Sequence, residues 1–157
     1  MKRKKLEVLE GLISESLALA AEVRAAEEEI HADLGITPGM RTVLAALAAM
    51  GPATVPRIAR ARGVSRQHVQ TVVNSFLAHG WAERTTNPEH KRSQLVHLTR
   101  DGRRLLREMN RREQRIWRRL DLEVKRGDLE AASEALSHVR QLLDSDDWRR
   151  AASRVRG

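Results

Sequence analysis

The 157-residue sequence contains no cysteine and no tyrosine, and its aromatic residues are one Phe and three Trp. Without cysteine there is no disulfide, no thiolate metal site and no cysteine redox switch. So few aromatics argue against the base-stacking surface of single-stranded nucleic-acid binders. No apolar run approaches the roughly 20 residues of a membrane span, and the basic N-terminus is not followed by a signal-peptide pattern. We therefore expect a cytoplasmic protein without membrane contact.

Positive charge is abundant and unevenly distributed. The chain has 29 Lys and Arg against 21 Asp and Glu, a formal net charge of +8. Residues 51–100 contain eight basic residues and only two acidic ones, Glu83 and Glu89. A segment so poor in acids predicts a surface that faces a polyanion, nucleic acid before membrane. Arg outnumbers Lys by 24 to 5, which suits bidentate contacts to phosphate or guanine, although codon bias in a GC-rich genome explains the preference equally well.

Apolar spacing and capping residues predict a mainly α-helical chain with about six helices and one β-hairpin. We expect helices over 6–34, from Thr37 to Gly51, from Thr54 to Arg62, from Ser65 to about His79, and over about 100–126 and 129–144. Thr37, Thr54 and Ser65 are the expected N-caps of their helices, and Thr99 and Asp128 are those of the last two helices. Strands at 81–84 and 95–98 flank a polar tip, residues 87–93, and together predict the hairpin.

The two short helices joined by Arg62-Gly63-Val64 form a candidate helix-turn-helix. At 100° per residue the apolar side chains of the second helix share one sector: Val69, Val72, Val73 and Phe76. The polar side chains lie nearly opposite: Arg66, Gln67, Gln70, Thr71 and Asn74, with Ser65 at the helix start. All of them hydrogen-bond base edges or phosphates readily. An ordinary solvated face is the alternative, but such a face usually includes Glu, whereas residues 60–80 contain no acid.

The hairpin supplies a second candidate DNA contact. Lys91 and Arg92 lie at its tip, where a long cationic side chain enters a minor groove or clamps a phosphate. Arg84 and Ser93, on the segments that flank the tip, complete the predicted DNA-binding set. The alternative is an exposed basic loop.

Four stretches of the sequence resemble the multiple-antibiotic-resistance regulator (MarR) family. They are Gly51–Ala59, Val64–Val69, Leu77–Arg84 and the hairpin from Asn87 through Leu95–Gly102, of which the last is the most specific. The resemblance covers essentially the whole chain. It implies a single domain over 1–157, with a winged helix-turn-helix core at 37–100 and dimerisation helices at 1–34 and 101–157.

By this resemblance the chain is a homodimeric bacterial transcription regulator, usually a repressor, that binds double-stranded DNA at a palindromic operator. Helix 66–79 would enter the major groove and Arg92 would reach the minor groove. The family often carries Asp where this sequence has Asn87 and His90. A small aromatic or phenolic effector is also implied, in a crevice near His31, Met40 and Arg41. Surface polar groups plus one core methionine are the alternative interpretation of those three residues.

The helix expected at 100–126 has one apolar stripe, and eight arginines fill the rest of its surface. Three interpretations of the arginines are open: a solvated face, ion pairs with the acidic run Glu27–Glu29 within one chain or across a dimer, and phosphate contact by residues 100–104.

We predict no catalytic function, no metal and no cofactor. The six histidines show no close metal-ligand spacing, although a zinc site assembled from distant residues stays open. No phosphate loop, dinucleotide fingerprint or nucleophile elbow is present. Two other function classes remain beside the sequence-specific regulator: a non-specific architectural DNA-binding protein and a protein-interaction module.

Overall fold

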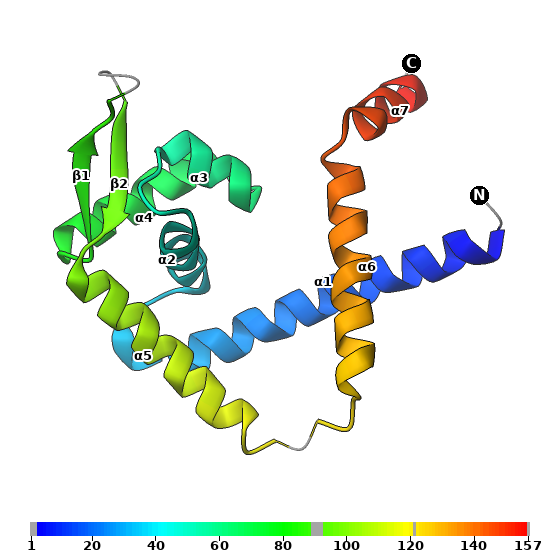
Figure 1. Cartoon of the computed structure of the whole chain (residues 1–157), viewed down its shortest axis with the longest axis horizontal. Coiled ribbons are helices and arrows are strands. Elements are labelled where there is room, and N and C mark those ends of the chain that lie inside the picture. Colours follow the sequence, from blue (N-terminus) through cyan, green and yellow to red (C-terminus); the bar gives the residue numbers. More distant parts are fainter. Residues whose placement is uncertain (1–2, 89–92, 121, 157) are drawn as a thin grey trace. The chain divides into compact units, whose positions relative to one another are not determined.

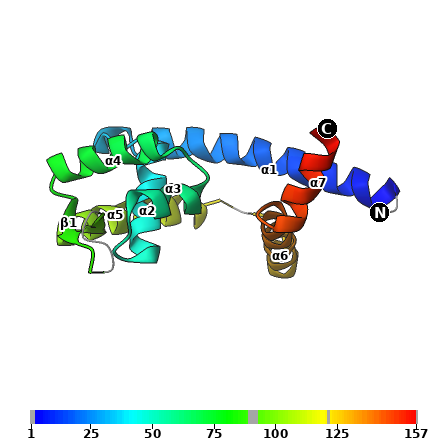
Figure 2. The same ribbon diagram turned by 90° about the horizontal axis from the view of Figure 1, so that it is seen from above.

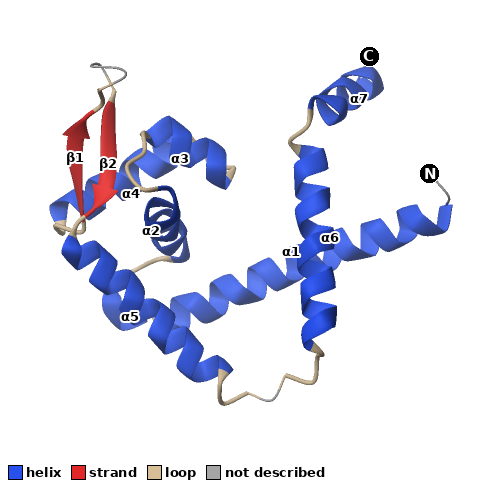
Figure 3. Cartoon of the chain, viewed as in Figure 1, coloured by secondary structure: helices blue, strands red, loops and turns tan. Residues whose placement is uncertain are grey.

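The computed structural model describes residues 3–88, 93–120 and 122–156. The chain divides into two compact units, Met1–Trp117 and Arg118–Gly157. The first unit contains α1 (Arg3–Ile30), the 3-10 helix η1 (Ala32–Leu34), α2 (Pro38–Met50), α3 (Val55–Arg62), α4 (Arg66–Ala78), β1 (Ala82–Thr86), β2 (Gln94–Leu98) and α5 (Arg100–Trp117) (Figure 1). The second contains α6 (Arg126–Leu143) and α7 (Asp146–Arg156). Helices predominate, as expected, and the two strands form one hairpin (Figure 3). Within the described ranges no helix is long and apolar enough to cross a membrane.

Three short polar side chains begin the helices of the winged core, as the sequence predicts. The hydroxyl oxygens of Thr37, Thr54 and Ser65 accept hydrogen bonds of 3.2, 3.4 and 3.1 Å from the backbone N–H three residues further on. Such caps satisfy donors that a helix start otherwise leaves without a partner. Gly63 ends α3 in the left-handed conformation, with φ at 64°, and turns the chain into α4 without the steric cost that a Cβ would add.

The hydrophobic core lies between α2, α3, α4, the hairpin and the first half of α5. Its fully buried side chains include Leu44, Ile58, Phe76 and Met109. The hairpin pairs antiparallel from Ala82 opposite Leu98 to Thr86 opposite Gln94. Ala53 forms an isolated bridge with Val96, which attaches the connection between α2 and α3 to the free edge of β2.

The Leu98-Thr99-x-x-Gly102 motif joins the hairpin to α5 by close contact. The Thr99 hydroxyl donates to the Gly80 carbonyl at 2.7 Å and accepts from the Gly102 N–H at 3.1 Å. A Cβ on Gly102 would lie 2.0 Å from the Trp81 carbonyl oxygen. Only glycine therefore lets α5 approach the start of the hairpin this closely.

α1 differs from the helices of the core because none of its residues is buried. Its C-terminal end meets the winged core, and its N-terminal part runs away from it (Figure 2). Leu17 and Leu19 are 67% and 62% exposed. The second unit is similar in this respect, since α6 also has no buried residue.

Several predicted helix boundaries are wrong. α1 ends at Ile30, because residues 32–34 tighten into a 3-10 turn before Gly35. The helix expected to reach 126 ends at Trp117, and α6 begins at Arg126, so that Gly127 and Asp128 lie in its first turn. α7 was not predicted. Trp117 and Leu120 are 60% and 56% exposed. The apolar side chains beyond residue 116 are therefore not packed against the chain, and no burial stabilises further helical turns.

Candidate nucleic-acid interface

α4 has the two faces that its sequence predicts. Val69, Val73 and Phe76 are fully buried and Val72 nearly so. The opposite face, here called the recognition face, is exposed except for a half-buried Gln70; it comprises Ser65, Arg66, Gln67, Gln70, Thr71 and Asn74. The position of these side chains confirms the amphipathic pattern, and their contact with DNA stays a prediction.

Some polar groups of the recognition face already have partners within α4. The Ser65 hydroxyl caps the helix, and the Thr71 hydroxyl donates to the Gln67 carbonyl at 3.1 Å. The Gln70 amide nitrogen donates to Asn74 Oδ1 at 2.8 Å. These bonds hold the shorter side chains close to the helix.

The hairpin contacts the recognition face through Arg84 of β1. Its guanidinium donates to Asn74 Oδ1 at 3.1 Å, so one predicted DNA-binding side chain is held by another. At the base of the tip the nearly buried Asn87 donates to the Ser93 hydroxyl at 3.0 Å. Asn87 thus ties the two strands together where the family often has Asp. His90, Lys91 and Arg92 lie outside the described residues.

Two hollows flank the hairpin, and among residues 3–88 and 93–120 no acidic side chain lines either one. The first, of about 400 Å³, lies between the recognition helix and the strands and includes Gln70 and Arg84. The second, of about 700 Å³, lies beside α3 and includes Arg57 and Arg60. The sequence has no acid from residue 34 to residue 82, and Glu83 and Glu89 are the two acids of the hairpin segment 82–98. The surface around α3, α4 and the hairpin is consequently electropositive.

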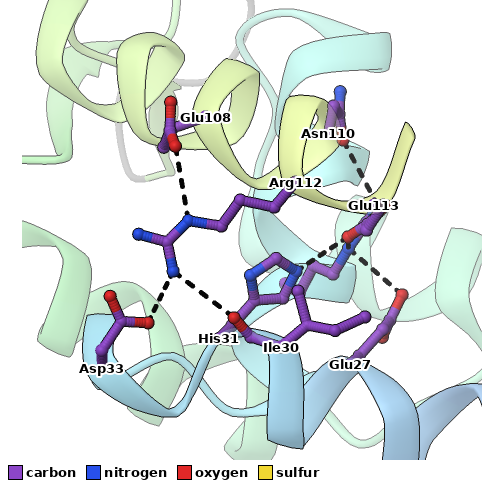
Figure 4. A network of polar contacts seen from close by, with 9 residues as sticks. Glu27, Ile30, His31, Asp33, Glu108, Asn110, Arg112 and Glu113 are labelled. Atoms are coloured by element: carbon purple, nitrogen blue, oxygen red, sulfur yellow. Dashed lines mark hydrogen bonds and ion pairs between the residues drawn. The ribbon is translucent and has the colours of Figure 1, made fainter. Parts of the chain in front are cut away.

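A second polar cluster lies where α1, α2 and α5 meet. We call it the polar joint: Glu27, His31, Arg41, Asn110 and Glu113. Arg41 donates to both oxygens of Glu113, each at 2.6 Å, to Asn110 Oδ1 at 3.3 Å, and pairs with Glu27 at 3.1 Å. His31 is 1% exposed, and its Nε2 lies 2.9 Å from Glu113 Oε1. Figure 4 shows His31, which directly follows α1, and Glu113 of α5 pointing toward one another.

The carboxylates of the polar joint have shifted pKa values of opposite sign. Burial raises the pKa of Glu113, but hydrogen bonds from Arg41 and His31 outweigh it and leave the pKa below the ordinary 4.5. Burial dominates at Glu27, whose pKa is raised despite Arg41. The hydrogen bond to Glu113 likewise raises the pKa of Arg41. The joint therefore stabilises one ionised carboxylate at the expense of the other.

A neighbouring ion pair also links η1 to α5. Arg112 donates to Asp33 Oδ1 at 2.6 Å, to Glu108 at 3.3 Å and to the Ile30 carbonyl at 3.4 Å (Figure 4). Its hydrogen bond is the main cause that lowers the pKa of Asp33.

The other arginines of α5 mainly pair within their own helix or remain solvated. Arg104 pairs with Asp101, and Arg111 with Glu108. Across residues 3–88 and 93–120 no arginine of α5 pairs with Glu27–Glu29. Within one chain, the described ion pairs therefore do not support the second interpretation of this face, while its pairing across a dimer stays a prediction.

A model of the MarR family matches residues 34–93. An uncharacterized protein of Mycobacterium tuberculosis (strain H37Rv) is 35% identical over 128 residues, which cover 82% of this chain and 89% of that protein. The chain belongs to the MarR family.

Solved structures of MarR-family proteins have the same fold. A crystal structure of a MarR family transcription regulator has a TM-score of 0.73 and 25% identity, covering 90% of this chain and 94% of its own. Staphylococcus aureus MarR in complex with salicylate and kanamycin has a TM-score of 0.75 at 16% identity, covering 90% of this chain and 97% of its own.

Two of the three residues predicted for a MarR-type effector crevice, His31 and Arg41, meet at the polar joint. His31 and Arg41 share the Glu113 carboxylate, and the half-buried Met40 packs against the hydrophobic core. Sequence reasoning missed Glu113 and Asn110, which no spacing relates to His31 or Arg41. One of its interpretations paired Glu27 with arginines of the helix at 100–126, whereas Glu27 pairs with Arg41. Among the described residues no group of three His, Asp or Glu side chains could hold a metal ion.

Proposed function

We propose that this MarR-family DNA-binding regulator is a homodimeric repressor that binds a palindromic operator. The observation that supports it is the acid-free recognition face beside an arginine-bearing hairpin. Arg66, Gln67, Gln70, Thr71 and Asn74 face the major groove in this proposal, while Arg57, Arg60 and Arg84 contact phosphates. The sequence adds Lys91 and Arg92 at the wing tip, with Arg92 in the minor groove.

The exposed apolar side chains of the terminal helices support the dimer. Within the described chain, α1 and α6 bury none of their residues, and Leu142 and Trp148 are 54% and 47% exposed. Apolar faces of this extent are normally covered by a partner. A second copy that covers them would place two recognition helices on half-sites one helical turn, ~34–36 Å, apart.

We further propose regulation by a small phenolic anion at His31, Met40 and Arg41. Salicylate, bound by the Staphylococcus aureus protein, has this chemistry. Arg41 is already paired with Glu113 and Glu27, so an anionic effector would exchange with one of these carboxylates. The exchange would loosen α1 from α5 and change the separation of the recognition helices.

Selection of bound sites from random double-stranded DNA tests the proposal. We expect one palindromic site whose affinity falls steeply with salt, since phosphate contacts release counterions, and exceeds that for random competitor by at least about a thousandfold. Equal affinity for every sequence would instead establish an architectural DNA-binding protein. Absence of salt-dependent DNA binding would indicate a protein-interaction module.

A further inference from the structure

Three side chains from two elements of the DNA-facing surface meet at a single atom. Asn74 Oδ1 accepts from Gln70 Nε2 at 2.8 Å and from Arg84 Nη2 at 3.1 Å. Gln70 and Asn74 are one turn apart on α4, whereas Arg84 comes from β1. The hairpin therefore reaches the recognition face through this oxygen.

The chemistry of the guanidinium fixes which amide atom faces which. Arginine has donors and no acceptor, so the Asn74 atom that it contacts is the carbonyl oxygen and not the amide nitrogen. The Gln70 atom facing that oxygen must then be a donor, its amide nitrogen. Arg84 thus determines the orientation of two amides, which otherwise rotate freely between two nearly isosteric states.

This orientation leaves Asn74 with donors only. A carbonyl oxygen has two lone pairs, and Gln70 and Arg84 occupy both. Within the described residues the Asn74 amide nitrogen has no hydrogen-bond partner, and neither does the Gln70 carbonyl oxygen. Asn74 consequently presents an NH₂ group to a ligand, and Gln70 presents an acceptor.

We propose that Arg84 is a positioning residue that makes Asn74 a donor-only reader of bases, an inference that rests on the proposed function. Asparagine usually reads adenine, accepting from N6 while donating to N7. With its oxygen occupied, Asn74 cannot accept from N6. It matches guanine, whose N7 and O6 are both acceptors in the major groove. Gln70, in contrast, favours a base with an exocyclic amino group, adenine or cytosine.

The test is selection of bound sites with the full-length protein and three variants. Asn74→Ala identifies the base pair that Asn74 reads, as the position where preference is lost. Arg84→Met removes the guanidinium, keeps most of the apolar stem and frees one lone pair of Asn74. We expect guanine at this position for the unmodified protein and a shift of about tenfold toward adenine in Arg84→Met, the size of one bidentate base contact.

Arg57→Met is the matched control because it removes one exposed arginine of the same surface without touching Asn74. It should weaken binding to all sequences equally and leave the base preferences unchanged. If Arg84→Met behaves in the same way, Arg84 is only a phosphate contact and the proposal is wrong. It is also wrong if Asn74→Ala loses preference nowhere, or if the unmodified protein selects adenine there. Failure of the proposed function is distinguishable, since the unmodified protein would then select no site.

Discussion

The recognition face and the polar joint are built from similar side chains but in opposite electrostatic settings. At the joint Arg41 contacts the carboxylates of Glu27 and Glu113, and the neighbouring Arg112 contacts those of Asp33 and Glu108. Around the recognition face no acid occurs between Asp33 and Glu83. Arginine at the joint is neutralised within the chain, and its geometry is fixed. The arginine and the amides on the recognition face have no carboxylate partner there, so they can donate hydrogen bonds to an external polyanion.

Burial separates the two regions as clearly as charge. The side chains of His31, Arg41 and Glu113 are 1%, 16% and 17% exposed, so each depends on its partners for hydrogen bonds lost with water. The recognition face is largely exposed, so removal of one hydrogen-bond partner there should cost little folding stability, because water replaces the partner. Mutations at the joint should therefore change folding stability, and mutations at the recognition face should change DNA affinity.

The largest effect is expected for Glu113→Ala at the polar joint. It leaves His31 without its carboxylate partner and Arg41 with only Glu27 and Asn110, inside a partly buried site. We expect the free energy of unfolding to fall by about 2 kcal/mol, below the range for fully buried pairs because water reaches part of the site. Chemical denaturation at a fixed protomer concentration measures it.

Glu7→Ala is the control for this prediction because Glu7 pairs with Arg3 on the exposed surface of α1. That variant should unfold at nearly the same denaturant concentration as the unmodified protein, since exposed pairs contribute little. Equal destabilisation by the two substitutions would show that the joint is no stronger than a surface ion pair.

An intermediate effect is expected when an acid is placed on the recognition face. Gln67→Glu should weaken operator binding by about tenfold, ~1.4 kcal/mol, because a carboxylate repels phosphate and cannot donate. Stability should stay unchanged, since Gln67 is exposed. Gln114→Glu on α5 makes the same charge change away from the recognition face and should bind nearly normally at equal salt. A similar loss with both variants would attribute the effect to net charge alone.

Local signals made the recognition face predictable. Caps such as Thr54 and Ser65 act within one helical turn, and the spacing of Val69, Val73 and Phe76 directly records burial. The Leu98–Gly102 motif also follows from local contact, through Thr99 and the Trp81 carbonyl. Each of these features relates residues that are close in sequence or in strand register. Such features therefore produce a spacing or a motif that can be recognised in the sequence.

The polar joint left no such trace. Glu113 lies 72 residues from Arg41 and 82 from His31, and an ion pair between distant helices has no period. Arg84 and Asn74 were each predicted to contact DNA, but their mutual bond depends on where β1 passes α4. The end of α5 at Trp117 was also unpredictable, because an apolar stripe does not distinguish a face buried within one chain from one that awaits a partner.

The smallest expected effect is the pH dependence of the joint. The pKa of Glu113 is lowered from 4.5 in the folded state, so its stabilisation is complete above 4.5 and is lost as the pH falls through the folded-state value. The pKa of Glu27 is raised from 4.5, so its contribution has the opposite sign and is present below 4.5. As the pH falls, protonation of Glu27 first adds to the folding stability, and protonation of Glu113 at lower pH then reduces it.

Two conservative variants separate these contributions. Glu113→Gln should lose less stability than the unmodified protein as the pH falls below about 4.5, because it lacks the carboxylate whose pKa is lowered in the folded state. Glu27→Gln should remove the gain in stability that accompanies protonation of Glu27. It should leave the loss of stability caused by protonation of Glu113 unchanged. Unfolding free energies measured across this range decide the matter: parallel curves for all three proteins would mean that neither carboxylate differs between the folded and unfolded states. Such a result would contradict the ion pairing that distinguishes the joint from the recognition face.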